Sequence, residues 1–187
     1  MNLKEDSIEK IFPSEYFTIF LTKQGFVYSC GQGANGVLGL GARTNHFKPT
    51  FVKMLDKFKI ENISVGTSFA ACLTKCSKIF FWGILGSENK EFFPKKVPFF
   101  EDKTPIAINS GCEALYVLTK DNRLFAMGSG SNGQLGSYDT VKSIVPVYIP
   151  NVPFLIVKKK SYIYFFFDFF FLCLIRHPTN TKKKSTY

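Results

Sequence analysis

Apolar and polar positions along this chain form short runs, and one such run recurs three times. Each copy reads Leu-Thr-Lys, three variable residues, an apolar residue, an aromatic residue and, three residues later, a glycine. The copies begin at Leu21, Leu73 and Leu118, which are 52 and 45 residues apart. A period of about fifty residues is typical of solenoids, propellers and repeat arrays. The chain is therefore expected to be a repeat protein, recognised through the surface it presents rather than through one active site.

The repeating unit extends on both sides of that run. Before it stand an apolar residue or proline, an isoleucine, and a glycine or serine, each three positions after the last. The three sets are Ile8, Ile11 and Ser14, then Ile60, Ile63 and Gly66, then Pro105, Ile108 and Gly111. After it, residues 31–39 and 128–136 share Gly-x-Gly-x-Asn-Gly-x-Leu-Gly at an offset of 97 residues. That offset equals the two spacings together, so the two alignments agree.

Within each unit, short apolar runs predict antiparallel strands. The first runs cover residues 16–21, 69–73 and 114–118, and the second cover 26–29, 79–82 and 124–127. The second set is rich in aromatic and β-branched residues, as strands are. Turn residues separate the runs, and Asn35-Gly36 and Asn132-Gly133 are the strongest hairpin dipeptides. No stretch before position 158 has helical periodicity, so the body of the chain is expected to be all-β.

Three pieces of the unit carry a family resemblance: residues 31–41 (GQGANGVLGLG), residues 79–83 (IFFWG) and the Ile-x-x-Ile-x-x-Gly element. Together they resemble the repeat of the regulator of chromosome condensation family over about residues 8–150. The resemblance implies a seven-bladed β-propeller with four-stranded blades, of which this chain would hold about three. The positions expected to shape the repeats are Gly31, Gly36, Gly39, Gly66, Trp82, Gly83, Gly111, Gly128, Gly133 and Gly136.

The chain departs from the family pattern at several positions. Cys30 and Met127 stand where the family has Trp, and only Trp82 keeps it. The middle unit lacks the Gly-Gln-Leu-Gly piece, in whose place residues 84–100 stand. These departures bear more on any specific activity than on the fold.

Two glycine clusters also match the G-x-G-x-x-G fingerprint of dinucleotide-binding folds, at residues 31–36 and 128–133. That fingerprint requires a following helix whose N-terminus faces the pyrophosphate, and residues 37–45 offer no amphipathic helix. Turn geometry explains the duplicated motif better, because glycine supplies positive φ. We therefore expect no cofactor.

Catalytic and metal-binding clusters have little support in the sequence. Of the two histidines, His46 lies in a polar connecting stretch and His177 in the tail. Cys72 and Cys76 form a close pair without a further Cys or His at zinc spacing. Five cysteines without a signal peptide fit a reducing compartment, cytoplasmic or nuclear. The chain is expected to be a non-enzyme without catalytic or metal-binding residues.

The net charge of +10 suggests nucleic acid or another anionic partner. Seven of the 24 basic residues but only one of the 14 acidic residues lie after position 157, which leaves +4 for the body. A solvated mixed-charge surface is the simpler interpretation of the body. Nucleic acid or chromatin stays an open partner.

Repeat periodicity stops at about Val157, so we expect a partial propeller at 1–157 and a Phe- and Lys-rich tail at 158–187. Three interpretations of residues 162–175 stay open. A membrane span would be short of the ~20 residues needed and would bury Asp168. An interfacial anchor would lack a polar helical face. The composition also fits read-through of an AT-rich intron, in which case the native product is longer; a membrane partner is expected only if the tail is native.

The resemblance implies a binding module whose loops contact another protein, without catalysis. It also implies a second possible role, guanine-nucleotide exchange on a small GTPase of the Ran type, with contact to chromatin. Exchange needs a specific acidic or wedge-like loop on one propeller face, and no loop here can be matched to one residue by residue. Similarity of fold alone does not decide between the two roles.

Overall fold

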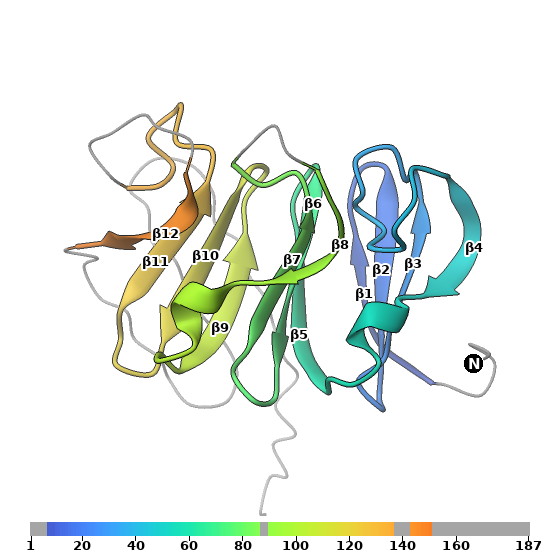
Figure 1. The fold of residues 1–187 in the computed structure, drawn as a ribbon, viewed down its shortest axis with the longest axis horizontal. Helices are drawn as coiled ribbons and strands as arrows, with labels where there is room; N and C mark the ends of the chain where they lie inside the picture. Colours follow the sequence, from blue (N-terminus) through green and yellow to red (C-terminus); the bar gives the residue numbers. More distant parts are fainter. Residues whose placement is uncertain (1–6, 87–89, 137–142, 151–187) are drawn as a thin grey trace, which may run out of the picture. The chain divides into compact units, whose positions relative to one another are not determined.

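The computed structural model describes residues 7–86, 90–136 and 143–150, which form twelve strands and two short 3-10 helices (Figure 1). The chain divides into one compact unit at 1–150 and a second at 151–187. The expected boundary near 157, and the tail that would follow it, fall on the second unit, outside the described residues.

The strands form three antiparallel four-stranded sheets, each made of strands consecutive in sequence (Figure 1). Blade 1 contains β1 (Ile8–Pro13), β2 (Phe17–Thr22), β3 (Val27–Gly31) and β4 (His46–Phe51). Blade 2 contains β5 (Ile60–Val65), β6 (Phe69–Thr74), β7 (Ile79–Gly83) and β8 (Glu91–Lys96). Blade 3 contains β9 (Pro105–Ser110), β10 (Ala114–Thr119), β11 (Leu124–Gly128) and β12 (Ser143–Ile149). The 3-10 helices η1 (Lys53–Leu55) and η2 (Pro98–Phe100) follow β4 and β8. The prediction of an all-β fold with about three propeller blades is confirmed.

The same register recurs in all three blades. The leucine of each Leu-Thr-Lys run pairs across the hairpin with the apolar residue six positions later: Leu21 with Val27, Leu73 with Ile79, Leu118 with Leu124. The residue seven positions before that leucine donates its N–H to the start of the second strand. These bonds run from Ser14 to Phe17, from Gly66 to Phe69 and from Gly111 to Ala114, at 2.8, 2.9 and 2.8 Å. Gly66 and Gly111 thus occupy equivalent positions, as expected from the repeat.

Each pair of neighbouring blades encloses one apolar cluster. Alternate residues of β6 point to opposite sides of blade 2, since side chains alternate along a strand. Ala70 and Cys72 join the cluster with blade 1, whereas Ala71 and Leu73 join the cluster with blade 3. Blade 2 is therefore covered on both faces, which is why β6 and β7 are unbroken runs of buried residues. The core residues expected from the repeat are all buried, namely Ile63, Leu73, Ile79, Ile108, Leu118 and Leu124.

The fourth strand of each blade was not located from the sequence. β4, β8 and β12 share an apolar residue followed two positions later by proline: Phe47 and Pro49, Phe92 and Pro94, Ile144 and Pro146. Each of these strands pairs on one side only within its sheet, and edge strands tolerate proline, which cannot donate to a ladder. Their spacings are 45 and 52 residues, the reverse of the leucine spacings, because the connections before them differ in length.

Candidate functional site

The connection from β3 to β4 leaves blade 1 and packs against blade 2. Trp82 Nε1 donates a hydrogen bond to the Val37 carbonyl at 2.7 Å, and the Gly41 N–H donates to the Phe92 carbonyl at 3.0 Å. Ser29 Oγ donates to the Leu38 carbonyl at 2.7 Å, which holds the connection to its own blade. Residues 32–45 contain turns and bends and no helix. The helix that a dinucleotide fingerprint needs is thus missing here, and the segment locks two blades together.

Two glycines make this close approach possible. Gly36 and Gly39 have φ values of +76° and +67°, a region that favours glycine. A Cβ on Gly36 would lie 2.9 Å from the Glu91 carbonyl oxygen, and one on Gly39 would lie 3.1 Å from Trp82 Nε1. Side chains at either position would therefore push the connection away from blade 2.

The other expected repeat positions lie at the ends of strands, just before strands, or in the segment that follows β11. Gly31, Gly83 and Gly128 end β3, β7 and β11, and Gly66 and Gly111 precede β6 and β10. Gly133 and Gly136 follow β11 and have φ values of +74° and +62°. Gly133 corresponds to Gly36, but a Cβ there would meet no atom within 4 Å. Side chains at Gly31, Gly83 and Gly128 would approach backbone atoms within 3.0 Å, so these three positions allow close backbone contacts.

Two departures from the family pattern occur together: blade 3 has no Trp at the repeat position, and the middle unit has no glycine-rich piece. Met127 occupies the position of Trp82 and is buried. The connection from β7 to β8 begins Ile84-Leu85-Gly86. Its sequence lacks the glycine-rich piece in which the Val37 carbonyl accepts the Trp82 hydrogen bond. Leu85 lies instead in the same buried cluster as Met127. An apolar pair therefore replaces a hydrogen-bonded one, with no buried indole N–H left unpaired.

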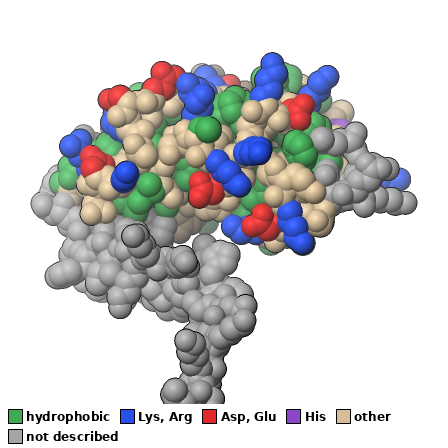
Figure 2. All heavy atoms as spheres, turned by 90° about the horizontal axis from the view of Figure 1, so that it is seen from below, with side chains coloured by type: hydrophobic (Ala, Val, Ile, Leu, Met, Phe, Trp, Pro, Cys, Tyr) green, Lys and Arg blue, Asp and Glu red, His purple; other side chains and the backbone are tan. Residues whose placement is uncertain are grey.

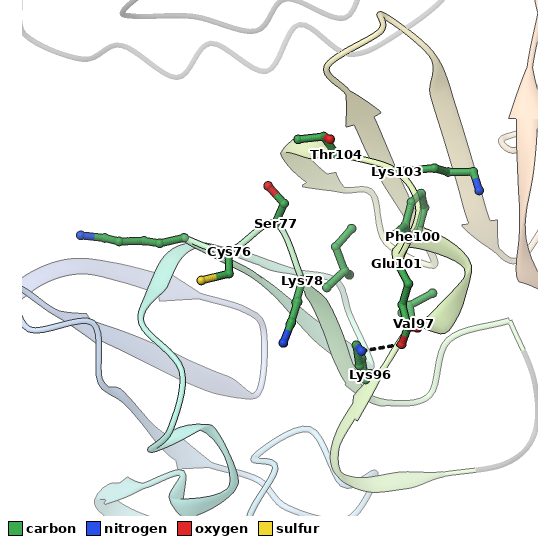
Figure 3. Close-up of a pocket in the computed structure, with 11 residues that line it drawn as sticks. Cys76, Ser77, Lys78, Lys96, Val97, Phe100, Glu101, Lys103 and Thr104 are labelled. Atoms are coloured by element: carbon green, nitrogen blue, oxygen red, sulfur yellow. Dashed lines mark hydrogen bonds and ion pairs between the residues drawn. The ribbon is translucent and has the colours of Figure 1, made fainter.

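A hollow of about 580 Å³ lies between the β6–β7 turn and the segment from the end of β8 to the start of β9 (Figure 3). We call it the basic pocket. Its lining residues are Lys75, Cys76, Ser77, Lys78, Ile79, Lys96, Val97, Phe100, Glu101, Lys103 and Thr104. Ile79, Val97 and Phe100 are buried and form its apolar floor. The polar and charged members surround that floor.

Four lysines and one carboxylate line the basic pocket. Lys96 Nζ donates to Glu101 Oε1, and the dashed line in Figure 3 marks this pair. That hydrogen bond and the Lys96 charge lower the pKa of Glu101, and the charge of Lys78 acts in the same direction. Lys103 Nζ donates to the Phe99 carbonyl at 3.0 Å and to Asp102 Oδ1 at 2.8 Å. Within the described part of the chain, Lys75 and Lys78 make no ion pair.

One face of the described part of the chain carries side chains of mixed charge. Figure 2 shows basic side chains interspersed with acidic and apolar ones on the face that it presents. This agrees with the expectation of a solvated mixed-charge surface for the body.

Side chains suited to catalysis or metal binding do not gather in the described residues. No group of three or more His, Cys, Asp or Glu in that part could hold a metal ion. The His46 ring nitrogens lie 3.3 and 3.1 Å from the hydroxyls of Thr44 and Thr50. Burial raises the pKa of the Cys72 thiol far above its ordinary value, so Cys72 is a core residue rather than a nucleophile. No helix within 7–86, 90–136 and 143–150 is long and apolar enough to cross a membrane.

Comparison with known proteins defines the class first. Residues 24–73 match the family model of the regulator of chromosome condensation (RCC1) repeat. The fold is similar to that of human WBSCR16, with a TM-score of 0.71, 24% identity, and coverage of 80% of this chain and 39% of that one. It is also similar to that of Prp20p from Saccharomyces cerevisiae, with a TM-score of 0.68, 17% identity, and coverage of 77% and 38%. These likenesses, together with the three blades, define a β-propeller of the RCC1 type.

Sequence relatives point to the same class. The chain is 30% identical over 139 residues to the ultraviolet-B receptor UVR8 of Arabidopsis thaliana, covering 71% of this chain and 32% of that protein. It is 31% identical over 129 residues to the human Regulator of chromosome condensation, covering 64% and 30%. The chain thus contains a repeat of the regulator of chromosome condensation type and is similar in sequence to proteins that carry this name. It spans about a third of the length of these curated relatives.

Proposed function

We propose that this chain is a protein-interaction module, a non-catalytic scaffold of the RCC1 type. The proposal rests on one observation: apolar side chains lie between the blades, whereas charged side chains line an open pocket. Apolar residues pack the blades together, while Lys75 and Lys78 of the basic pocket make no ion pair in the described part of the chain. Relatives named for a photoreceptor and for a regulator of chromosome condensation share the repeat, so the repeat itself is a frame for different partners.

A second candidate is guanine-nucleotide exchange on a small GTPase of the Ran type, with contact to chromatin. Two similarities favour it: the 31% identity to the human Regulator of chromosome condensation, and the likeness to Prp20p, for which binding to Gsp1p and histones has been examined. In this role the chain would act on a nucleotide-bound protein in the nucleus. The module role is compatible with either the cytoplasm or the nucleus.

One assay separates the two candidates. A Ran-type GTPase loaded with a fluorescent guanine nucleotide is mixed with the full chain and excess unlabelled nucleotide. A scaffold should leave nucleotide release at its unaided rate, whereas an exchange factor should accelerate it in proportion to its concentration. Acceleration that saturates with GTPase would overturn the first proposal in favour of the second.

A second experiment tests the module itself. The immobilised full chain is exposed to nuclear and cytoplasmic extracts, and retained proteins are identified. The expected result is a small set of proteins retained by the wild type and lost after unfolding the chain in urea. Retention of no protein above the unfolded control would contradict the module role.

A further inference from the structure

We propose that the basic pocket binds a short acidic peptide segment of a protein partner, through carboxylates that pair with Lys75 and Lys78. This inference rests on the proposed role as a protein-interaction module and gives that role a place and a ligand chemistry.

The pocket is open because one backbone contact between blades is missing. At the junction of blades 1 and 2, the Ile60 N–H donates to the Gly25 carbonyl at 3.2 Å, which holds the β2–β3 turn against the next blade. The equivalent residues at the junction of blades 2 and 3 are Pro105 and Ser77. Proline has no N–H to donate, so this closing bond cannot form.

The side chain of Ser77 also opposes closure. A Cβ on Gly25 would lie 3.2 Å from the Ile60 nitrogen, which is tighter than ordinary contact. Ser77 carries a Cβ at this position, with φ at +57°. The β6–β7 turn therefore stands away from the start of blade 3, and the hollow follows from two substitutions in the repeat.

The pocket is basic because lysines replace phenylalanines of the preceding junction. Lys78, Lys96 and Lys103 correspond to Phe26, Phe51 and Phe58. The rings of Phe26 and Phe51 pack edge to face with centroids 5.9 Å apart, and Phe58 packs on Phe80 at 4.7 Å. Aromatic packing thus fills the first junction, whereas the second presents ammonium groups around an apolar floor.

The distribution of charge selects an anionic ligand. Lys96 forms an ion pair with Glu101. Lys103 forms an ion pair with Asp102 and donates a hydrogen bond to the Phe99 carbonyl. In Figure 3 the Lys78 amine and the Ser77 hydroxyl lie on the turn side of the hollow, opposite Glu101 and Thr104. The Lys78 ammonium contacts the Phe58 ring at 5.9 Å and has no carboxylate partner among the described residues. Carboxylates on a ligand would gain charge-assisted hydrogen bonds here.

A peptide fits this pocket better than a nucleic acid does. Nucleic-acid binding depends on many phosphate contacts along an extended basic surface and on exposed aromatic rings for stacking. The pocket is instead a hollow of about 580 Å³, and its aromatic residue, Phe100, is buried. Carboxylates for the lysines and one apolar side chain for the floor of Ile79, Val97 and Phe100 match its chemistry.

The test uses the full chain and a fluorescein-labelled peptide with several glutamates flanking one leucine, followed by fluorescence anisotropy. The double variant Lys75→Gln/Lys78→Gln should bind roughly 3- to 10-fold more weakly, since each exposed pair contributes modestly. The variant Lys48→Gln/Lys53→Gln removes the same charge from blade 1 and its following helix, and should bind like the wild type. Glu101→Gln releases Lys96 and should strengthen binding. Equal loss in both double variants would overturn the proposal.

Geometry is tested separately from charge. Ser77→Gly/Pro105→Ile restores the residues of the preceding junction without changing any charge, and should weaken binding by closing the hollow. Occupancy is read directly from alkylation: the peptide should slow the modification of exposed Cys76, a pocket residue, and leave exposed Cys112 unaffected. Unchanged affinity and unchanged Cys76 alkylation would contradict a ligand in the pocket.

Two comparisons identify the class of ligand. A glutamine version of the peptide should not bind, and a single-stranded oligonucleotide of equal charge should bind more weakly than the acidic peptide. An oligonucleotide that binds as tightly would overturn the peptide proposal in favour of a polyanion site. If extract proteins are retained but the peptide does not bind, the pocket proposal fails and the module role stands. If no extract protein is retained, the module role fails whatever the peptide does.

Discussion

The Trp82 indole donates its Nε1 proton to the Val37 carbonyl at 2.7 Å across the boundary of two blades. The two residues are 45 positions apart in the chain, and both are buried. This bond ties the glycine-rich connection of one repeat to the aromatic position of the next. The connection of blade 1 is thereby held by blade 2, and contacts of this kind between neighbouring repeats are the physical basis of cooperativity in a repeat protein.

Replacement of Trp82 by phenylalanine should destabilise the chain by roughly 1 to 3 kcal/mol, because the buried Val37 carbonyl loses its donor. Urea denaturation followed by circular dichroism measures this loss. Met127→Leu is the matched control at the equivalent position of blade 3, where no such bond exists, and should cost less than about 1.5 kcal/mol. Equal losses in the two variants would show that the hydrogen bond is unimportant.

Equivalent isoleucines at two blade faces should respond differently to truncation. Ile63 is 2% exposed between blades 1 and 2, whereas Ile11 on the outer face of blade 1 is 56% exposed. Ile63→Ala should cost roughly 2 to 5 kcal/mol through the cavity it leaves, and Ile11→Ala within about 0.5 kcal/mol. Chemical denaturation of the two variants checks this. A large loss for Ile11→Ala would mean that its face is covered in solution, for instance by a second copy.

Gly36 and Gly133, the glycines of the two Asn-Gly dipeptides, should also differ in their response to substitution. Gly36→Val places a side chain in a positive-φ conformation and against the Glu91 carbonyl. Gly133→Val meets the same backbone strain, of order 1 to 3 kcal/mol, but open space. Gly36→Val should therefore be the more destabilising by at least about 1 kcal/mol, as overpacking adds to strain. Thermal unfolding of both variants tests the difference, and identical shifts would refute it.

Neither glycine variant should affect nucleotide binding, since we expect none in the wild type. Equilibrium dialysis with a labelled dinucleotide checks this. Saturable binding that Gly36→Val abolishes would support a cofactor site instead.

The cysteines should react according to their burial. Burial raises the pKa of the Cys72 thiol, so thiolate, the reactive form, is scarce at neutral pH. Iodoacetamide should modify Cys76 and Cys112, which are exposed, and should reach Cys72 only under unfolding concentrations of urea. Peptide mapping by mass spectrometry gives the order, and early modification of Cys72 would show that blade 2 opens easily.

Acid should remove one local contribution to stability. The Thr119 hydroxyl donates to Asp121 Oδ1 at 2.6 Å, and this bond is the main reason that the pKa of Asp121 lies below its ordinary value. A lowered carboxyl pKa stabilises the folded state above the unfolded pKa, and the effect disappears as pH falls through the folded pKa. Asp121→Asn should therefore weaken stability at pH 7, and its difference from the wild type should shrink as the pH falls toward 2. Denaturation at both pH values measures this.

The sequence by itself determined the repeat, its period and the hairpins at its centre. The pairing of Leu73 with Ile79 and the positive φ of Gly36 depend on alternation and turn chemistry within a few residues. Such signals depend on residues that are neighbours in sequence, so they are visible before the positions of the blades are known. The repeat pattern also predicts Trp82 as a repeat position, but it does not predict that Trp82 donates a hydrogen bond to the Val37 carbonyl.

Tertiary structure decided what happens between blades. Variable connections hid the outer strands β4, β8 and β12 from a fixed period. The basic pocket joins the β6–β7 turn to residues 96–104, and it exists because Pro105 and Ser77 deny blade 3 the contact that Ile60 and Gly25 make in the preceding junction. A missing N–H or an added Cβ has this effect only where two blades approach closely, so its consequence became visible once the blades were stacked.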